Sequence, residues 1–335
     1  MSTNAGQTGR TGHAARAAHG LRVGHTRGEA VTVTTADGTE ILRYVYRPDP
    51  DAFESRKPYA HPVRTLAGRT VTGYRPNDHR WHKGLQMTAS HLSGQNFWGG
   101  NSYVHGSGYL PLPERIGSMR HDGFSAFTAG ADRFDCTEDL TWVENGGAEW
   151  AREERGLSVH SVDEETGAWV LDWSIRLTNV RDEPLVFGSP TTAGREMAGY
   201  TGLQWRGPRD FTGGTVLAPG AGGDGPVAGA EAGTGRFMGT QGPWLAFTGE
   251  HDEVDAHSTL VFAHAPENLD ARAAIHLSHW FVRSEPIPSV AFSWAFFEEF
   301  ALPPGESFAY RYRIVVADGA WDRERVTAYL ESLPW

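Results

Sequence analysis

The most regular alternation in the chain covers residues 169–178, which read Trp-Val-Leu-Asp-Trp-Ser-Ile-Arg-Leu-Thr. Every second position of this stretch is a large apolar residue, and most of the positions between them are polar. Successive side chains of a β-strand point to opposite faces, so the pattern predicts a strand with one buried and one wetter face. Strands of this kind are typical of antiparallel sheets. The stretch therefore predicts an all-β protein.

Further strand signals lie on both sides of this stretch. Valines and threonines alternate over residues 31–34, and the Asp37-Gly38 turn leads to a return strand over 41–46, which predicts a hairpin. A second strand pair and four later strands are expected at 138–142 with 148–152, and at 244–248, 259–264, 290–297 and 307–316. These signals predict an antiparallel two-sheet β-sandwich.

A short C-terminal helix is the only helix with a clear signal. Asp322 is a suitable N-cap, and the apolar residues that follow it recur on one helical face: Val326, Tyr329, Leu330 and Leu333. Residues 1–25 are expected to form a flexible tail, and residues 26–335 a single β-sandwich domain. The Gly- and Ala-rich segment 213–235 is expected to be a long surface loop.

Composition excludes several classes of function. The 335 residues include 30 Lys and Arg against 41 Asp and Glu, and the formal net charge of −11 disfavours nucleic acid as a partner. Cys136 is the only cysteine, so an internal disulfide is excluded. No apolar stretch is long enough to span a bilayer, and no secretion signal is visible. We therefore expect no membrane partner and a cytoplasmic location.

Histidines are concentrated between residues 61 and 91. This interval contains His61, His79, His82 and His91, and Asp78 directly precedes His79. Imidazole transfers protons near neutral pH, and a neighbouring carboxylate can orient it. His79 and His82 are three residues apart, so their side chains converge only in a loop or a helical turn. The preceding Asn77-Asp78 favours such a turn.

Two kinds of site remain open for this cluster. The histidines can act as acid/base groups, or they can bind a divalent metal together with carboxylates such as Asp78, Glu298 and Glu299. The spacing of these histidines matches no standard zinc signature. Metal binding is therefore the alternative interpretation, and acid/base catalysis is the main one. Simple structural roles, in which the imidazoles bond the backbone of loops, also remain open for each histidine taken alone.

Three other segments carry candidate ligand-binding residues. Residues 194–206 combine glycines that permit sharp bends with polar groups, namely Arg195, Glu196, Tyr200 and Arg206. Residues 257–280 contain His264 at a strand end and His279 beside a tryptophan. Glu298 and Glu299 lie between two phenylalanines, which favours a partly buried carboxylate. The chain also has 12 Trp, and an indole face is a suitable platform for a sugar.

These segments, taken in order, resemble the bacterial family DUF6807, often labelled "PmoA family". The resemblance rests on His-Pro-Val-Arg-Thr at 61–65, on Arg-Pro-Asn-Asp-His-Arg-Trp-His-Lys-Gly-Leu at 75–85 and on Asn-Phe-Trp at 96–98, and it continues through 194–206, 258–264 and 297–312. The chain has Trp81 and Lys83 where the family pattern more often has His and Arg. The "PmoA" label implies a membrane subunit, which the absence of a long apolar stretch contradicts.

The resemblance implies a sandwich similar to galactose mutarotases, the supersandwich fold, and a role in carbohydrate metabolism. Members commonly occur beside Gfo/Idh/MocA-type oxidoreductases. We therefore expect an enzyme that acts on a sugar or an oxidised (keto) glycoside by elimination, hydrolysis or epimerisation. The alternative is a non-catalytic sugar-binding or scaffold protein that partners such an oxidoreductase.

The expected roles follow from residue chemistry. His79 and His82 would transfer protons, Asp78 would orient one of them, and Glu298 would be the second proton carrier, with Glu299 as its substitute. Arg64 and Arg195 would hold hydroxyls or a developing oxyanion. The remaining substrate contacts are expected from His61, His91, Trp98, Glu196, Tyr200, His264, His279 and Glu299. The expected small-molecule partner is a carbohydrate; no cofactor beyond the alternative metal is expected.

Overall fold

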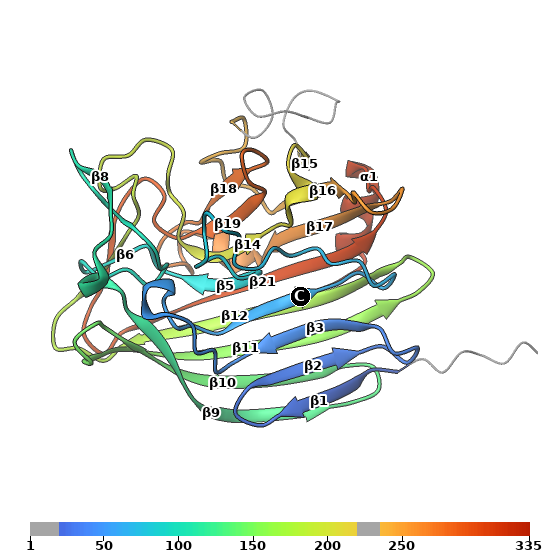
Figure 1. Cartoon of the computed structure of the whole chain (residues 1–335), viewed down its shortest axis with the longest axis horizontal. Helices are drawn as coiled ribbons and strands as arrows, with labels where there is room; N and C mark the ends of the chain where they lie inside the picture. The colour runs from blue at the N-terminus through green and yellow to red at the C-terminus, as the bar shows by residue number, and fades with distance from the viewer. Residues whose placement is uncertain (1–19, 220–234) are drawn as a thin grey trace, which may run out of the picture.

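The alternating segments pair into two large antiparallel sheets (Figure 1). The computed structural model of the chain describes residues 20–219 and 235–335. The first sheet has the spatial order β1 (Arg22–Thr26), β2 (Ala30–Thr34), β3 (Glu40–Val45), β4 (Tyr59–Val63), β5 (Leu85–Thr88), β14 (Gly202–Arg206), β19 (Ser289–Ser293) and β18 (His279–Arg283). The hairpin expected around Asp37-Gly38 is confirmed as the β2–β3 pair.

The second sheet contains the longest strands. Its spatial order is β15 (Thr215–Leu217), β16 (Trp244–Glu250), β17 (His257–His264), β21 (Ser307–Asp318), β12 (Ala168–Asn179), β11 (Glu149–Asp163), β10 (Phe134–Val143) and β9 (Ser118–Ala129). Two small sheets lie beside the large ones. One consists of β20 (Phe300–Leu302), β13 (Leu185–Gly188) and β6 (His91–Leu92). The other consists of β7 (Ser102–Val104) and β8 (Gly108–Leu110).

One apolar core lies between the two large sheets. Trp169, Leu171 and Trp173 of β12 are buried in it, as the alternation over 169–178 predicts, and they share it with Leu203 and Trp205 of β14 in the first sheet. Burial of apolar surface is the main favourable term in folding, so this shared core holds the two layers together. The predicted antiparallel two-sheet sandwich is confirmed.

The helix α1 (Arg323–Glu331) covers part of the outer face of the second sheet. The Asp322 side chain accepts a hydrogen bond of 2.8 Å from the backbone N–H of Arg325, which caps the helix. Val326 is fully buried against Val170 and its neighbours, and the other predicted apolar residues of the face pack around it. The predicted helix and its buried face are confirmed.

Three boundaries differ from those expected. Strand structure begins at Arg22, inside the tail expected over residues 1–25. The strand β1 is a mostly exposed edge strand without an apolar pattern, and main-chain pairing with β2 holds it in place. Thr215–Leu217 forms a short strand inside the expected loop. The strand expected over 290–297 ends at Ser293, and the chain then bends. Residues 1–19 and 220–234, where most of the expected tail and loop fall, lie outside the described residues.

The outer face of the first sheet provides the floor of the candidate site. Along β14 and β18, Leu203 and Trp280 face the core, whereas Gln204, Phe281 and Arg283 point to the opposite side. Loops from β4–β5, β6–β8, β13–β14 and β18–β19 rise around this part of the sheet. Residues far apart in the sequence are therefore brought together over four adjacent strands.

Candidate functional site

The β4–β5 connection holds Asp78, His79 and His82 in a tight turn. The backbone N–H of His79 donates to the carbonyl of Pro76, and that of His82 donates to the carbonyl of His79, both at 2.9 Å. The two imidazole rings are 4.8 Å apart between centroids. The convergence that the three-residue spacing predicts in a loop is therefore observed.

Glu54 holds both ends of this turn. Its carboxylate accepts hydrogen bonds of 3.0 and 2.6 Å from Arg75, before the turn, and lies 3.0 Å from the Nζ of Lys83, after it. Lys57 donates to the carbonyl oxygen of Trp98 at 2.7 Å. Lys57 and Lys83 are the only lysines of the chain, and both are buried. A buried, ion-paired cluster thus fixes the turn to the adjoining loop.

The cluster has perturbed protonation equilibria. Burial raises the pKa of Glu54, but the hydrogen bond from Arg75 and the nearby Lys83 outweigh burial and hold that pKa below its ordinary value. Burial lowers the pKa of Lys57 well below its ordinary value, and the charge of Lys83 lowers it further. Removing one partner from such a cluster leaves an uncompensated buried charge, which is strongly destabilising.

A pocket of about 290 Å³ opens above the turn. Its lining combines aromatic and polar side chains from all four loops and from the sheet: Asp78, His79, Trp81, His82, Trp98, Asn101, Tyr109, Arg195, Tyr200, Phe281, Arg283, Ile287 and Ser289. The rings of Trp98 and Tyr200 are 4.5 Å apart, and those of Tyr200 and Phe281 are 5.5 Å apart. An aromatic wall of this kind beside a few polar groups is typical of small-molecule sites.

The floor beneath the pocket is a hydrogen-bonded polar layer, although the side-chain oxygen of Gln86 has no partner within the described residues. Gln86 donates to the side-chain oxygen of Gln204 at 2.8 Å, and Gln204 donates to the hydroxyl of Ser289 at 3.1 Å. The same hydroxyl donates to the carbonyl oxygen of Trp205 at 3.0 Å. Because cross-strand hydrogen bonds tie β5, β14 and β19 together here, the floor is rigid.

His82 is held as a neutral imidazole. Burial lowers its pKa well below the ordinary value, and the adjacent His79 and Arg206 lower it further. The Nη1 of Arg206 lies 3.1 Å from the Nδ1 of His82. A guanidinium can only donate, so Nδ1 of His82 is the acceptor and the proton of the ring is on Nε2.

His79 is the more exposed member of the pair. Its Nδ1 is 3.4 Å from the Oδ2 of Asp78, within reach of an ion pair but longer than a good hydrogen bond. Burial lowers the pKa of His79, and the charge of Asp78 partly offsets that effect. A neutral imidazole beside a carboxylate is suited to accept a proton at neutral pH.

The pocket brings together six of the predicted site residues, namely Asp78, His79, His82, Trp98, Arg195 and Tyr200. Sequence reasoning missed Asn101, Tyr109, Phe281, Arg283 and Ser289. Phe281 and Arg283 alternate with the core residues of β18, so their outward direction could have been read from the strand period. Trp81, where the chain departs from the family pattern, also lines the pocket.

Other predicted residues lie elsewhere in the structure. His61 stacks on Tyr74 at 4.8 Å between ring centroids, and burial lowers the pKa of His61 to about 4. Arg64 donates to the carboxylate of Glu40 at 3.0 Å. His91 lies 3.3 Å from the carbonyl oxygen of Tyr103. These contacts fix loops and strands of the sheets.

The late candidates also lie outside the pocket lining. His264 is buried among core aromatic rings, and burial lowers its pKa to about 3. His279 packs against Phe297. Glu196 is exposed. The expectation of a partly buried carboxylate at Glu298 or Glu299 is wrong, because the chain bends after β19 and leaves both side chains exposed.

The model of a family described as "Family of unknown function (DUF6807)" matches residues 31–331, which is most of the chain. The chain belongs to the DUF6807 family. No curated protein matches this DUF6807 chain.

Several solved structures are similar to the DUF6807 chain. The GH36 alpha-galactosidase from Geobacillus stearothermophilus is 13% identical, with a TM-score of 0.38, over 89% of this chain and 40% of the other. The alpha-galactosidase from Lactobacillus brevis is 10% identical, with a TM-score of 0.41, over 93% of this chain and 41% of the other. Galactose 1-epimerase from Lactobacillus acidophilus is 11% identical, with a TM-score of 0.32, over 89% and 94%. The DUF6807 chain thus spans about 40% of the alpha-galactosidases, and these remote likenesses transfer no activity to it.

Within the described part of the DUF6807 chain, no group of three or more His, Cys, Asp or Glu side chains is arranged to hold a metal ion. None of the helices in that part is long and apolar enough to cross a membrane.

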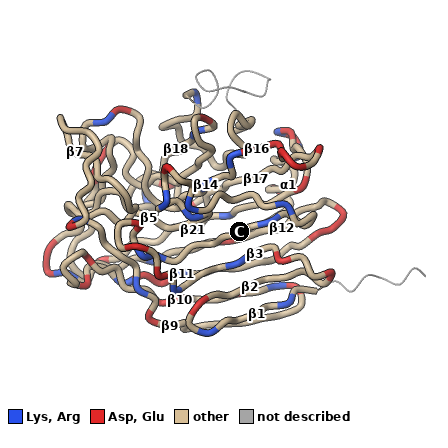
Figure 2. The backbone as a smooth tube through the Cα atoms, in the orientation of Figure 1, with Lys and Arg blue, Asp and Glu red and all other residues tan. Residues whose placement is uncertain are grey.

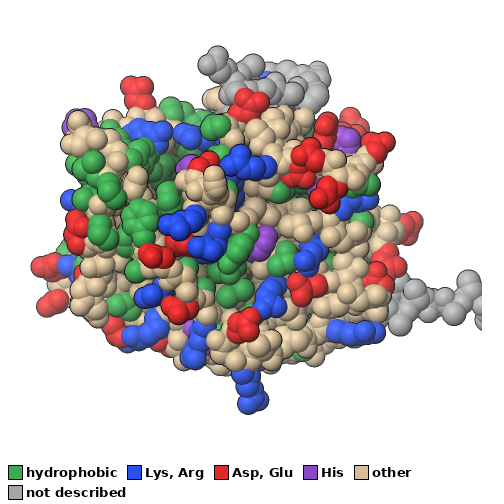
Figure 3. Space-filling model, in the orientation of Figure 1, with side chains coloured by type: hydrophobic (Ala, Val, Ile, Leu, Met, Phe, Trp, Pro, Cys, Tyr) green, Lys and Arg blue, Asp and Glu red, His purple; other side chains and the backbone are tan. Residues whose placement is uncertain are grey.

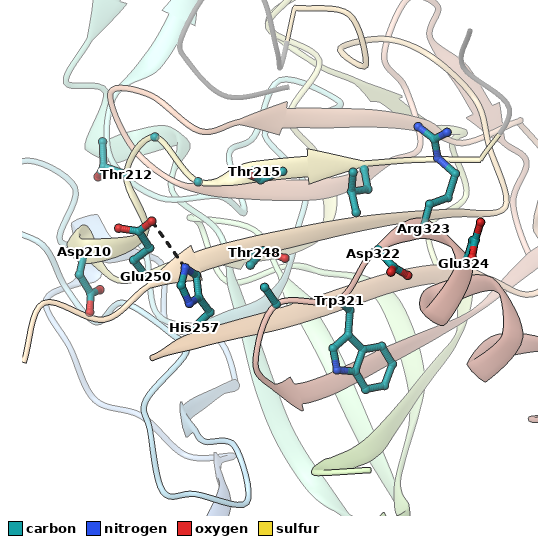
Figure 4. Close-up of a pocket in the computed structure, with 14 residues that line it drawn as sticks. Asp210, Thr212, Thr215, Thr248, Glu250, His257, Trp321, Asp322, Arg323 and Glu324 are labelled. Carbon is teal, nitrogen blue, oxygen red and sulfur yellow. Dashed lines mark ion pairs between the residues drawn. The ribbon is translucent and has the colours of Figure 1, made fainter. Parts of the chain in front are cut away.

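A second cavity of about 880 Å³ lies between the edge of the second sheet at β15 and β16 and the start of α1 (Figure 4). Asp210, Glu250, Asp322 and Glu324 contribute acidic side chains to it, and His257 lies 3.6 Å from Glu250. None of the site residues predicted for the DUF6807 chain lines this cavity. The pocket above the 75–83 turn is therefore the candidate site.

Proposed function

We propose that the protein is a carbohydrate-active enzyme that binds a sugar or keto glycoside in this pocket and transfers a proton through His79. The observation that carries the proposal is the Asp78–His79 pair, which faces the neutral imidazole of His82 in an aromatic-lined pocket. Titratable groups with perturbed pKa values in such a setting are candidates for catalysis.

Binding follows from the lining. The rings of Trp81, Trp98 and Phe281 offer apolar surface to the C–H face of a sugar ring. Asn101 offers an amide to its hydroxyls. Burial raises the pKa of Tyr200 well above its ordinary value, so this phenol stays protonated and acts only through hydrogen bonds. The volume of the pocket is at the small end of the range for ligand sites, which favours one sugar ring.

The proposed chemistry uses the two histidines differently. Neutral His79 accepts the proton of a C–H bond next to a carbonyl group, and the electron pair of that bond spreads onto the carbonyl oxygen. Asp78 stabilises the imidazolium that forms. His82, with its proton on Nε2, donates a hydrogen bond to the carbonyl oxygen on which the negative charge develops. Elimination and epimerisation next to a keto group both begin with this proton transfer. Hydrolysis begins with it when the leaving group is eliminated first and water then adds to the double bond.

A screen of simple and 3-keto glycosides with purified protein, with and without EDTA, tests the proposal. We expect conversion of at least one keto glycoside, unaffected by EDTA, and its loss in His79→Ala. If the wild-type protein binds sugars but converts none, the site is a binding module, and the pairing with a Gfo/Idh/MocA-type oxidoreductase becomes the better hypothesis. Activity that EDTA abolishes and a divalent metal restores would contradict the acid/base assignment.

A further inference from the structure

Three arginines converge on the candidate pocket, and within the described residues none of them has a carboxylate within ion-pair distance, although the charge of Asp78 favours the charged form of Arg206. Arg195 and Arg283 line it, and Arg206 lies directly behind His82. Within the described residues, Arg206 bonds only His82 and the carbonyl oxygen of Gly207, although it is 1% exposed. Arg195 donates to the Tyr109 hydroxyl. None of the three forms an ion pair with Asp or Glu in that part of the chain.

The only acidic side chain among the described lining residues is already engaged. Asp78 lies 3.4 Å from His79 and 3.7 Å from Arg209, an exposed arginine that does not line the pocket. The pocket therefore has a surplus of positive charge in a protein whose net charge is −11. Basic positions gather near β5 and β14 in Figure 2, and in Figure 3 basic side chains surround hydrophobic and histidine side chains in the middle of the same face.

The surplus charge is costly in the absence of a ligand. Burial lowers the pKa of Arg206 to about 10. Burial also lowers the pKa of Arg283, and the neighbouring charge of Arg195 lowers it further. A desolvated guanidinium stays charged at neutral pH and destabilises the fold unless a counter-charge is supplied. An anionic ligand would supply that counter-charge.

Aromatic rings hold two of these guanidinium groups in place. Arg195 lies over the Tyr109 ring at 4.9 Å from its centroid, and Arg283 lies over the Phe281 ring at 5.2 Å. The Tyr109 hydroxyl is in turn 2.7 Å from that of Tyr200. Arg283, which forms no hydrogen bond within the described residues, keeps its N–H edge for the planar, two-point recognition of a carboxylate. Arg195 uses Nη1 for the Tyr109 hydroxyl and keeps its other N–H groups for a ligand.

We propose that the ligand of this pocket is an acidic sugar, whose carboxylate binds Arg195 and Arg283. The proposal rests on the proposed function of the pocket and names its substrate class. A carboxylate is favoured over a phosphate because phosphate sites usually add backbone N–H groups of a helix N-terminus. Here the lining consists of loops and strands, and α1 lies on the second sheet.

Calorimetric titration of the full chain tests this substrate class. The probes are D-glucuronate and D-galacturonate, the matched neutral sugars D-glucose and D-galactose, and D-glucose 6-phosphate, each at low and high NaCl. We expect at least one uronate to bind at least about tenfold more tightly than its neutral partner, with the difference shrinking at high salt. Loss of a charge-assisted hydrogen bond in Arg283→Gln or Arg195→Gln should weaken uronate binding about 10- to 100-fold and change neutral-sugar binding much less.

Two further variants distinguish the loss of an arginine's charge in the pocket from a general effect of substitution on the fold. Arg283→Lys should recover part of the uronate affinity, and Arg176→Gln, which removes an exposed arginine of β12 in the other sheet, should leave it unchanged. Equal affinities for uronates and neutral sugars would overturn the proposal while leaving the proposed function intact. Tighter binding of the sugar phosphate than of either uronate would also overturn it. If none of these five probes binds, the acidic-sugar proposal is overturned, and the proposed function fails as well when the screen of 3-keto glycosides also shows no binding and no conversion.

Discussion

Lys83 and Glu54 form an ion pair of 3.0 Å in which neither side chain is more than 2% exposed. Glu54 also binds Arg75, so one carboxylate joins the two ends of the turn that carries Asp78, His79 and His82. The geometry of the candidate site therefore depends on a buried charge cluster that lies behind the pocket and not in it.

Replacing Glu54 should damage both stability and the site. In Glu54→Gln the buried charge of Lys83 loses its counter-charge, and we expect a loss of about 3–5 kcal/mol in the free energy of unfolding. Urea denaturation measures it. The matched control is Glu29→Gln, which breaks a surface ion pair with Arg43 and should cost less than about 1 kcal/mol. Equal losses in the two variants would contradict the role of Glu54.

Gly100 should tolerate no side chain. Its φ is +70°, and a Cβ atom there would lie 2.4 Å from the indole ring of Trp81. Gly100→Ala should therefore cost about 1–3 kcal/mol through backbone strain and should also displace Trp81 from the pocket. Thermal denaturation and sugar titration should both detect the change. Gly94→Ala is the control, since its φ of +86° is also strained but no atom lies within 4 Å of the added carbon; it should lose stability while sugar affinity is retained.

The buried His264 should make the protein sensitive to acid. Its pKa is about 3 in the fold against an ordinary value of 6.5, because burial disfavours the charged ring. The folded state thus binds fewer protons than the unfolded state, so the contribution to stability is complete above pH 6.5 and declines as the pH falls. At pH 5 the decline from this group is about 2 kcal/mol.

The variant His264→Phe should therefore lose less stability than the wild type between pH 7.5 and pH 5 in urea denaturation. His257→Phe, at a more exposed position beside Glu250, should lose as much as the wild type. An unchanged slope in His264→Phe would show that His264 does not titrate in this way.

The sequence predicted the sandwich well but the site only in part, and the reason is physical. Alternation over 169–178 and the Asp322 cap are local patterns, so the strand and the helix that they predict are found. The spacing of His79 and His82 is also local. Arg283 and Tyr109 reach the pocket only because β18 and β8 lie near the 75–83 turn in space, and no pattern in one sequence encodes that pairing. The prediction that Glu298 is partly buried was wrong for the opposite reason: a local pattern was present, but the phenylalanines beside Glu298 in the sequence do not cover its side chain in the fold.

The pH dependence of turnover should report the Asp78–His79 pair. Burial lowers the pKa of His79, so the acidic limb of the kcat/KM profile should lie below pH 6.5. The charge of Asp78 raises that pKa, and Asp78→Asn should therefore move the limb to lower pH while reducing the rate at neutral pH. A limb that moves to higher pH in Asp78→Asn would contradict the assignment of His79 as the base.

The most direct test of the central claim compares two histidines that each lie beside an aspartate. His79 pairs with Asp78 at 3.4 Å in the pocket, whereas His160 pairs with Asp172 at 3.0 Å on the other sheet. On a keto glycoside that the wild type converts, His79→Ala should lose about 10²- to 10⁴-fold in turnover while staying folded, and His160→Ala should keep nearly full turnover. Full turnover in His79→Ala would place the chemistry outside this pocket and contradict the account.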